Sequence, residues 1–146
     1  MFPFAVTDLK AYFAGAWRLS RRIEDHGAGN TGTFEGRAEF VPDGPELRYH
    51  EAGTMSLGAF SGGAYRDYVY AFPTPTRAEV RFPDGRAFHA VDLAAGAADA
   101  RHLCGDDTYE GRYDLDGPAV WTLRWRIVGP HKDLTLTGIY QRPQEP

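Results

Sequence analysis

The stretch TFEGRAEF, residues 33–40, alternates between small or apolar residues and polar or charged ones. One parity holds Phe34, Gly36, Ala38 and Phe40, and the other holds Thr33, Glu35, Arg37 and Glu39. Successive side chains of a β-strand point to opposite faces, so this pattern predicts a strand with one face toward a core. The glycine and alanine on the inward face indicate a tight bend, or a space left for another group.

The same twofold period precedes and follows this strand. Residues 15–25 and 46–57 each place apolar side chains on one face, and each of these faces also carries one charged residue, Arg21 and Glu51 respectively. A buried carboxylate that is ionised and unpaired is costly. We therefore expect Glu51 either to pair with a partner such as Arg21 or to be twisted outward near Gly53.

Further strands are predicted between turn sequences rich in glycine, proline and aspartate. These turns lie at residues 42–45, 61–63, 83–85 and 129–132, and Asp-Gly within 83–85 is a strong hairpin signal. We expect the alanine-rich segment 94–100 to form a loop or a single helical turn. The chain thus contains about eight to ten short strands with mostly short connections.

A short helix is predicted over residues 7–14, before the first strand. Thr7 is the expected N-cap, and Leu9, Tyr12 and Phe13 recur at helical spacing before Gly15 ends the run. Two turns are not stable alone in water, so we expect this helix to pack on the rest of the chain near a cavity mouth, in the position of a lid.

Composition limits the class of protein. The 146 residues, with 42% hydrophobic and 25% charged, predict one globular domain over residues 1–146, divided into the helix, a barrel over 15–142 and a tail over 143–146. A net charge of −4 argues against nucleic acid as a partner. No apolar run of about 18 residues occurs, so no membrane span is expected.

The single cysteine allows no intrachain disulfide, and the N-terminus lacks the features of a secretory leader. We therefore expect a cytoplasmic location. The oligomeric state is left open.

This many antiparallel strands suits a sandwich or an up-and-down barrel, and short connections from each strand to the next favour the barrel. The sequence also resembles the calycins, the group that includes lipocalins and fatty-acid-binding proteins. In that group a Gly-x-Trp on the first strand lies at the closed end, and a basic residue from the last strand packs across the indole. The resemblance rests on Gly15-Ala16-Trp17 and on Arg142, and it implies a cation–π contact between Trp17 and Arg142.

The sequences GRAFHAVDL (85–93), RHLCGDDTYEGRY (101–113) and WRIVGPHKD (125–133) are also similar to an uncharacterised family of small bacterial proteins with a calycin-like barrel. That resemblance implies the same fold and no particular activity. The fold prediction is therefore an all-β, antiparallel up-and-down barrel with a short N-terminal helix.

Residues 101–113 are the most polar cluster of the chain. His102 and Cys104 stand two apart and share a strand face, so a third ligand such as His89 would allow a zinc site. No Cys-x-x-Cys or His-Glu-x-x-His supports a metal, and a hydrogen-bonded histidine beside a small buried cysteine is the plainer interpretation. We assign no metal ligand and leave the cofactor unknown, with haem held by His89 or His102 still open.

The tyrosines of this cluster raise a question of register. Tyr109 and Tyr113 share their parity with Asp107, which is opposite to that of His102 and Cys104. If both sets point inward, we expect a β-bulge around Gly105 to absorb one residue. The alternative is a plain turn at residues 105–106 with only one set inside.

Two functions remain open, together with a weaker third. The first is a small-molecule-binding barrel, for an aromatic or anionic ligand, and the second is a lyase, isomerase or hydrolase with an acid/base set inside the barrel. The third is an interaction domain whose interior is filled by its own side chains. We favour binding. The catalytic candidates are His89, His102, Asp107 and Tyr109, and the ligand-binding candidates are Arg66, Tyr68, Tyr70, Phe88, Cys104, Tyr113, Trp125 and Tyr140.

Tyr140 and Arg142 also resemble, in reversed order, the Tyr/Arg sets with which fatty-acid-binding barrels hold a carboxylate. If Arg142 covers Trp17, it is structural and unavailable to a ligand. We favour that structural role.

Overall fold

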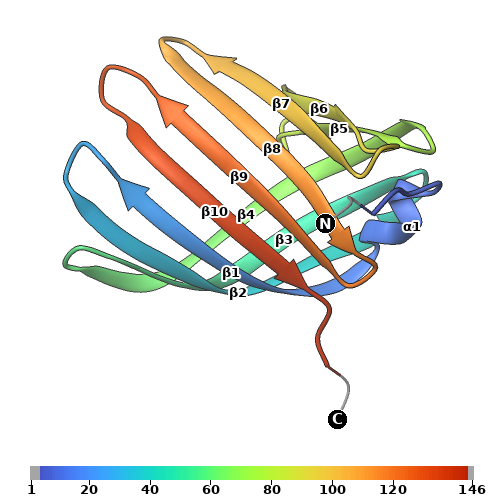
Figure 1. Ribbon diagram of the computed structural model, residues 1–146, viewed down its shortest axis with the longest axis horizontal. Helices are drawn as coiled ribbons and strands as arrows, with labels where there is room; N and C mark the ends of the chain where they lie inside the picture. Colours follow the sequence, from blue (N-terminus) through green and yellow to red (C-terminus); the bar gives the residue numbers. More distant parts are fainter. Residues whose placement is uncertain (1–3, 145–146) are drawn as a thin grey trace.

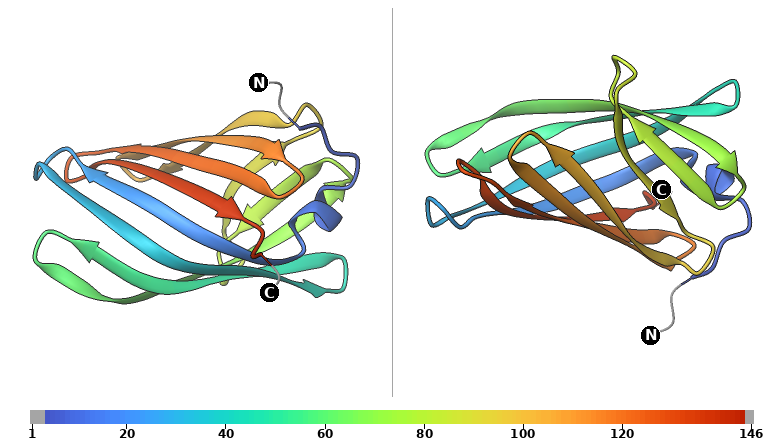
Figure 2. Two further views of the ribbon diagram at one scale, coloured as in Figure 1. Left: turned by 60° about the horizontal axis from the view of Figure 1, so that its bottom comes forward. Right: turned by 90° about the horizontal axis from the view of Figure 1, so that it is seen from above.

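The computed structural model describes residues 4–144 and confirms the all-β prediction (Figures 1 and 2). One short helix, α1, precedes ten strands. The elements are α1 (Leu9–Phe13), β1 (Gly15–Asp25), β2 (Asn30–Asp43), β3 (Glu46–Leu57), β4 (Phe60–Thr74), β5 (Arg77–Arg81), β6 (Ala87–Asp92), β7 (Ala97–Cys104), β8 (Asp107–Gly117), β9 (Val120–Val128) and β10 (Asp133–Gln141). No helix within the described part of the chain is long and apolar enough to cross a membrane.

The strands form one antiparallel sheet in the order β6-β5-β4-β3-β2-β1-β10-β9-β8-β7. Consecutive strands therefore pair from β1 to β6 and from β7 to β10, and β1 also pairs with β10. Only β6 and β7 lie side by side without a hydrogen-bonded ladder, so the sheet closes into a nearly complete up-and-down barrel with one seam (Figure 1).

Three predicted boundaries were wrong, and the first is the turn predicted at residues 61–63, which lie within β4. The helix spans residues 9–13 rather than 7–14, and its N-cap is Asp8, whose carboxylate accepts a hydrogen bond from the Ala11 amide at 3.1 Å. The segment 94–100 is not a loop throughout, because β7 begins at Ala97. Alanines carry no strand signal of their own, and pairing with β8 makes this segment a strand. Of the predicted tail, residues 145–146 lie outside the described residues.

The helix closes one end of the barrel instead of lying at its mouth. Phe13 is fully buried and packs on Phe40 and Trp121, each with ring centroids 5.0 Å away. The Tyr12 hydroxyl donates to the carbonyl of Gly117 in the β8–β9 turn at 2.7 Å. The β7–β8 and β9–β10 turns lie at the opposite end (Figure 1). The position expected for the helix was therefore wrong, because the apolar side chain of Phe13 reaches into the core and plugs this end.

The closure between the two ends of the chain is present as predicted. The Arg142 guanidinium lies 3.7 Å from the centroid of the buried Trp17 ring. It also donates to the carbonyl oxygens of Ala16, Tyr12 and Ala14 at 2.8–3.0 Å. Arg142 thus joins the last strand to α1 and to β1, and it is not available to a ligand.

We predict that Arg142→Ala lowers the free energy of unfolding by about 2–3 kcal/mol, because it removes a cation–π contact and charge-assisted hydrogen bonds to carbonyls. Urea denaturation measures this change. Arg48→Ala is the matched control, since Arg48 forms an exposed ion pair with Asp43 and should cost under about 1 kcal/mol. Equal stability of Arg142→Ala and the parent protein would contradict the closure.

Gly36 and Gly53 face one another across β2 and β3. A Cβ on either residue would collide with the backbone of the other strand. The inward glycine of the sequence pattern therefore allows the close approach of two backbones, a role different from the tight bend or open space that the sequence suggested.

A buried ion pair lies inside the barrel and confirms the predicted partnership of Arg21 with Glu51. The guanidinium donates to both carboxylate oxygens of Glu51, at 2.7 and 2.9 Å, and Glu51 is only 2% exposed. The Tyr49 hydroxyl donates to the same carboxylate at 2.6 Å and lies 2.9 Å from the Tyr140 hydroxyl. Burial alone would raise the pKa of Glu51, but the hydrogen bonds and charge of Arg21 outweigh it and the pKa is lowered.

We predict that Glu51→Gln lowers the free energy of unfolding at pH 7 by about 3–5 kcal/mol, because it leaves the Arg21 charge buried and unpaired. A carboxyl whose pKa is lower in the folded state stabilises above its unfolded value, and this contribution is lost as the pH falls through the folded value. The difference between parent and variant should therefore shrink below the ordinary pKa of 4.5.

Urea denaturation at a series of pH values measures this difference. Glu35→Gln, which alters an exposed hydrogen bond to Ser20, is the control and should change stability little. A gap between parent and Glu51→Gln that stays constant down to pH 3 would contradict the linkage.

Candidate functional site

A β-bulge in β6 shapes the interior. Val80 pairs with His89 and Arg81 pairs with Ala87, so Phe88 is an extra residue opposite β5. Both Phe88 and His89 are consequently buried, although adjacent residues of a regular strand point to opposite faces. The bulge that the sequence suggested near Gly105 thus occurs in another hairpin, where it turns two adjacent side chains into the barrel.

The β7–β8 hairpin resolves the question of register differently from either alternative. Residues 105 and 106 form a plain turn, and Cys104 pairs with Asp107. His102 then lies directly opposite Tyr109, and Ala98 opposite Tyr113. A two-residue turn reverses the parity, so both sets share the inner face without a bulge.

The interior is open at the end away from α1. A cavity of about 620 Å³ lies there, between the ends of β4–β10. Its walls are mainly aromatic and aliphatic, with three cations at the rim. It is lined by Arg66, Tyr68, Phe82, Arg86, Ala87, Phe88, His102, Leu103, Cys104, Tyr109, Trp125, Ile127, Lys132, Leu134 and Leu136.

Phe88 is the centre of the aromatic wall. Its ring stacks on Trp125 and Phe82, with centroids 5.2 and 4.9 Å away. Tyr68 lies 5.3 Å from it, and His102 meets it edge-on at 5.1 Å. The bulge therefore supplies the side chain about which a continuous aromatic surface is built.

Positive charge gathers among the lining residues. Arg66, Arg86 and Lys132 line the cavity, and no carboxylate does. Lys132 donates to the Tyr109 hydroxyl at 3.1 Å and lies 3.4 Å from Asp107, just outside the wall. Hydrogen bonding to Tyr109 and the charge of Asp107 raise the pKa of Lys132, so this residue stays cationic. The mouth is therefore electrostatically suited to an anion.

A polar layer forms the floor of the cavity. His89 contacts the Tyr113 hydroxyl through Nε2 at 2.7 Å, whereas its Nδ1 is buried and has no partner among residues 4–144. Burial, reinforced by the nearby charge of His102, lowers the pKa of His89 to about 3. A space of about 20 Å³ remains beside His89, Tyr113 and Tyr140, enough for one water molecule.

The ligand-binding candidates divide into two groups. Five line the cavity, and Tyr70, Tyr113 and Tyr140 lie below it in the packed floor. Tyr140 is held there by a face-to-face stack on Trp121, with centroids 3.8 Å apart. The five wall residues are Arg66, Tyr68, Phe88, Cys104 and Trp125.

The catalytic candidates do not form one hydrogen-bonded set. His102 and Tyr109 line the cavity, Asp107 pairs with Lys132, and His89 lies in the floor. Within residues 4–144, no hydrogen bond or ion pair joins a carboxylate to His89 or His102. The structure thus brings two of the four into one wall and leaves the other two engaged elsewhere.

The zinc site that the sequence left as a less favoured possibility has no counterpart among the described residues. No three histidine, cysteine, aspartate or glutamate side chains within residues 4–144 are placed to hold a metal ion. His89 is occupied by Tyr113, and Cys104 is exposed at the rim.

Several wall residues were missed by sequence analysis. Lys132 sits in the predicted turn at residues 129–132, and Arg86 follows the β5–β6 hairpin turn. Leu134 and Leu136 could have been identified from the alternation in β10, because they share the inward face of that strand with Tyr140. No local pattern marks the turn residues, because their place at the mouth depends on how the barrel closes.

The family described as "Family of unknown function (DUF6314)" matches residues 13–142. The chain belongs to this family. The matched range covers all ten strands and the Trp17–Arg142 closure, and it confirms the resemblance to a barrel family of unknown function. No curated protein matches the chain in sequence.

Solved structures share the fold of this DUF6314 member at low sequence identity. The S-type phycobiliprotein lyase CPES from Guillardia theta has a TM-score of 0.64 and 11% identity, covering 98% of this chain and 95% of its own. The barrel EF1p2_mFAP2b bound to DFHBI has a TM-score of 0.53 and 16% identity, and the match covers 95% of this chain and 100% of that barrel. The redesigned barrel mFAP0, also bound to DFHBI, has a TM-score of 0.51 and 18% identity, and the match covers 90% of this chain and 99% of that barrel. These likenesses establish the fold alone.

We predict that the ring signals of His89 do not shift between pH 8 and pH 5, because its folded pKa is about 3. The unfolded state binds the proton from its ordinary value of 6.5 downward, so His89 alone removes stability as the pH falls from 6.5 toward 3, at about 1.4 kcal/mol per unit. NMR titration measures the shift, and His89→Gln assigns the signals. A midpoint near 6.5 would show that the floor is hydrated.

Proposed function

We propose that this protein binds a small aromatic anion in the cavity opposite α1. The observation that carries the proposal is an aromatic wall beneath three cations, with no carboxylate among the lining residues. Apolar rings remove the body of such a ligand from water, and Arg66, Arg86 and Lys132 attract its charge.

The size of the cavity agrees with this class of ligand. Its volume of about 620 Å³ lies within the range of small-molecule pockets. The ring planes of Phe88 and Trp125 are only 18° apart and their centroids lie 5.2 Å from one another, so the two rings are stacked. A planar ring can extend that stack toward Tyr68 or Tyr109, with its acidic group at the rim.

The fold comparisons support binding in general. The two neighbours bound to DFHBI are barrels that hold a small molecule, and the third is named as a phycobiliprotein lyase. The residues of the present cavity, rather than these likenesses, define the proposed ligand as aromatic and anionic.

The acid/base alternative has weaker support. A general base works best with a pKa near the operating pH, whereas burial and the charge of His102 hold the pKa of His89 at about 3. Asp107 is turned toward Lys132 and packs closely on Gly129, so it does not orient either cavity histidine. The geometry supports a site that binds and orients better than one that transfers protons.

The proposal predicts that 1-anilinonaphthalene-8-sulfonate, an aromatic anion, binds the folded protein with one-to-one stoichiometry. Phe88→Ala should weaken binding about tenfold or more by opening the stack, and Arg66→Gln about fivefold by removing charge. Fluorescence titration and native mass spectrometry measure affinity and stoichiometry.

Arg48→Gln, on the outer surface of β3, is the matched charge control and should leave affinity unchanged. Each variant is first shown to unfold cooperatively, since this dye also binds loosened cores. A neutral analogue that binds as tightly as the anion would overturn the charge assignment. Equal affinity of Phe88→Ala and the parent would overturn the cavity as the site.

A further inference from the structure

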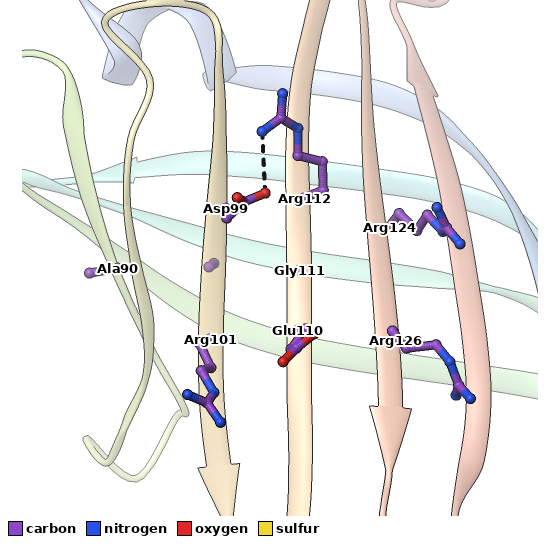
Figure 3. A pocket seen from close by; sticks show the side chains of 9 residues that line it. Ala90, Asp99, Arg101, Glu110, Gly111, Arg112, Arg124 and Arg126 are labelled. Atoms are coloured by element: carbon purple, nitrogen blue, oxygen red, sulfur yellow. Dashed lines mark hydrogen bonds and ion pairs between the residues drawn. The ribbon is translucent and has the colours of Figure 1, made fainter.

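We propose that the outer face of β7, β8 and β9 is a docking site for an acidic polypeptide segment in extended conformation. A groove of about 560 Å³ lies there beside the seam between β6 and β7 (Figure 3). This arginine groove is lined by Ala90, Asp99, Ala100, Arg101, Glu110, Gly111, Arg112, Arg124 and Arg126. It is separate from the ligand cavity, with which it shares no lining residue.

Strand register assembles the charged side chains. Arg101 of β7 pairs with Glu110 of β8, which pairs with Arg126 of β9. One step along the same outer face, Asp99 pairs with Arg112, which pairs with Arg124. The groove therefore carries four guanidinium groups and two carboxylates, although the whole protein has a net charge of −4.

The arginines are only partly neutralised within the protein. Arg112 reaches Asp99 at 3.2 Å and Asp114 at 3.5 Å, as Figure 3 shows for Asp99. Arg126 is held by the carboxylate of Asp133 and donates to the carbonyls of Ile127 and Leu134. Within residues 4–144, neither Arg101 nor Arg124 has an ion pair or a side-chain hydrogen bond, so these two arginines are the cations left for a partner. Arg112 and Arg124 also lie directly opposite one another, and like charges in that position destabilise a sheet. An added carboxylate between them would relieve this repulsion.

The spacing points to an extended peptide as the occupant. Arg101 and Arg124 flank β8, and Arg124 lies two residues along β9 from the position in line with Arg101, which is an offset of about 6–7 Å along the strand direction. An extended peptide with acidic residues at every second position has the same repeat. Each carboxylate can then be bound by the two-pronged guanidinium of one arginine.

The floor of the groove admits a backbone. Ala90 has a small side chain, and Ala100 and Gly111 border the groove with their backbone, because Ala100 is buried and a Cβ on Gly111 would meet the inward-facing Trp125 ring. The unpaired edges of β6 and β7 meet at this seam. A segment lying here therefore finds little steric obstruction beside a row of cations.

The test is fluorescence anisotropy with a fluorescein-labelled peptide of alternating glutamate and threonine. We expect binding at low ionic strength that weakens as salt rises. Arg124→Gln and Arg101→Gln should each reduce affinity about fivefold, and Arg124→Glu should abolish it. Arg37→Gln and Arg48→Gln, arginines on the outer faces of β2 and β3, are the matched controls and should have no effect.

Four outcomes would overturn the proposal. These are no binding by the parent protein, equal weakening by the control variants, equal affinity for the glutamine version of the peptide, and equal affinity for the same glutamates placed in one block. Tighter binding of a single-stranded RNA oligonucleotide would point to nucleic acid and would also overturn it. Each variant is checked for unchanged urea denaturation and unchanged binding of the aromatic anion.

Discussion

The rest of the interior depends on the buried pairing of Arg21 with Glu51. The pair and the hydroxyls of Tyr49 and Tyr140 form a hydrogen-bonded layer across the barrel. On the α1 side of this layer, aromatic rings fill the space, as shown by the close stack of Tyr140 on Trp121. Buried charges must stay paired, so the layer resists collapse and fixes where the packed half ends. The opposite half is left open, and the cavity lies there.

Alternating sequence and short connections were enough to predict the strands, the barrel and one long-range contact, that of Arg21 with Glu51, because both charges fall on inward faces. The contact of Trp17 with Arg142 was implied instead by the resemblance to calycins. Exact neighbours in the sheet were not predictable, since register depends on turns and bulges that leave little trace in composition. Phe88 illustrates this: regular alternation would place only one of Phe88 and His89 on the inner face, whereas the bulge places both inside.

The sequence predicted the aromatic character of the candidate site, but it did not predict all of the residues that line the cavity. The aromatic residues on regular inward positions, such as Tyr68 and Trp125, were identified from parity. Arg86 and Lys132 were not, because each belongs to or borders a turn and reaches the mouth only once hairpins distant in sequence have come together. Parity also could not separate wall from floor, so Tyr113 and Tyr140 were grouped with residues that a ligand can reach.

Strand β9 carries both proposed sites on opposite faces. Trp125 lines the cavity, while Arg124 and Arg126 on either side of it line the arginine groove on the outer face. Because side chains alternate along a strand, an aromatic ligand and an acidic peptide would contact no atom in common. Any influence of one on the other must therefore pass through the position of the β9 backbone. Ladders to β8 and β10 hold that backbone on both sides, so the two sites should act independently unless β9 moves as a unit.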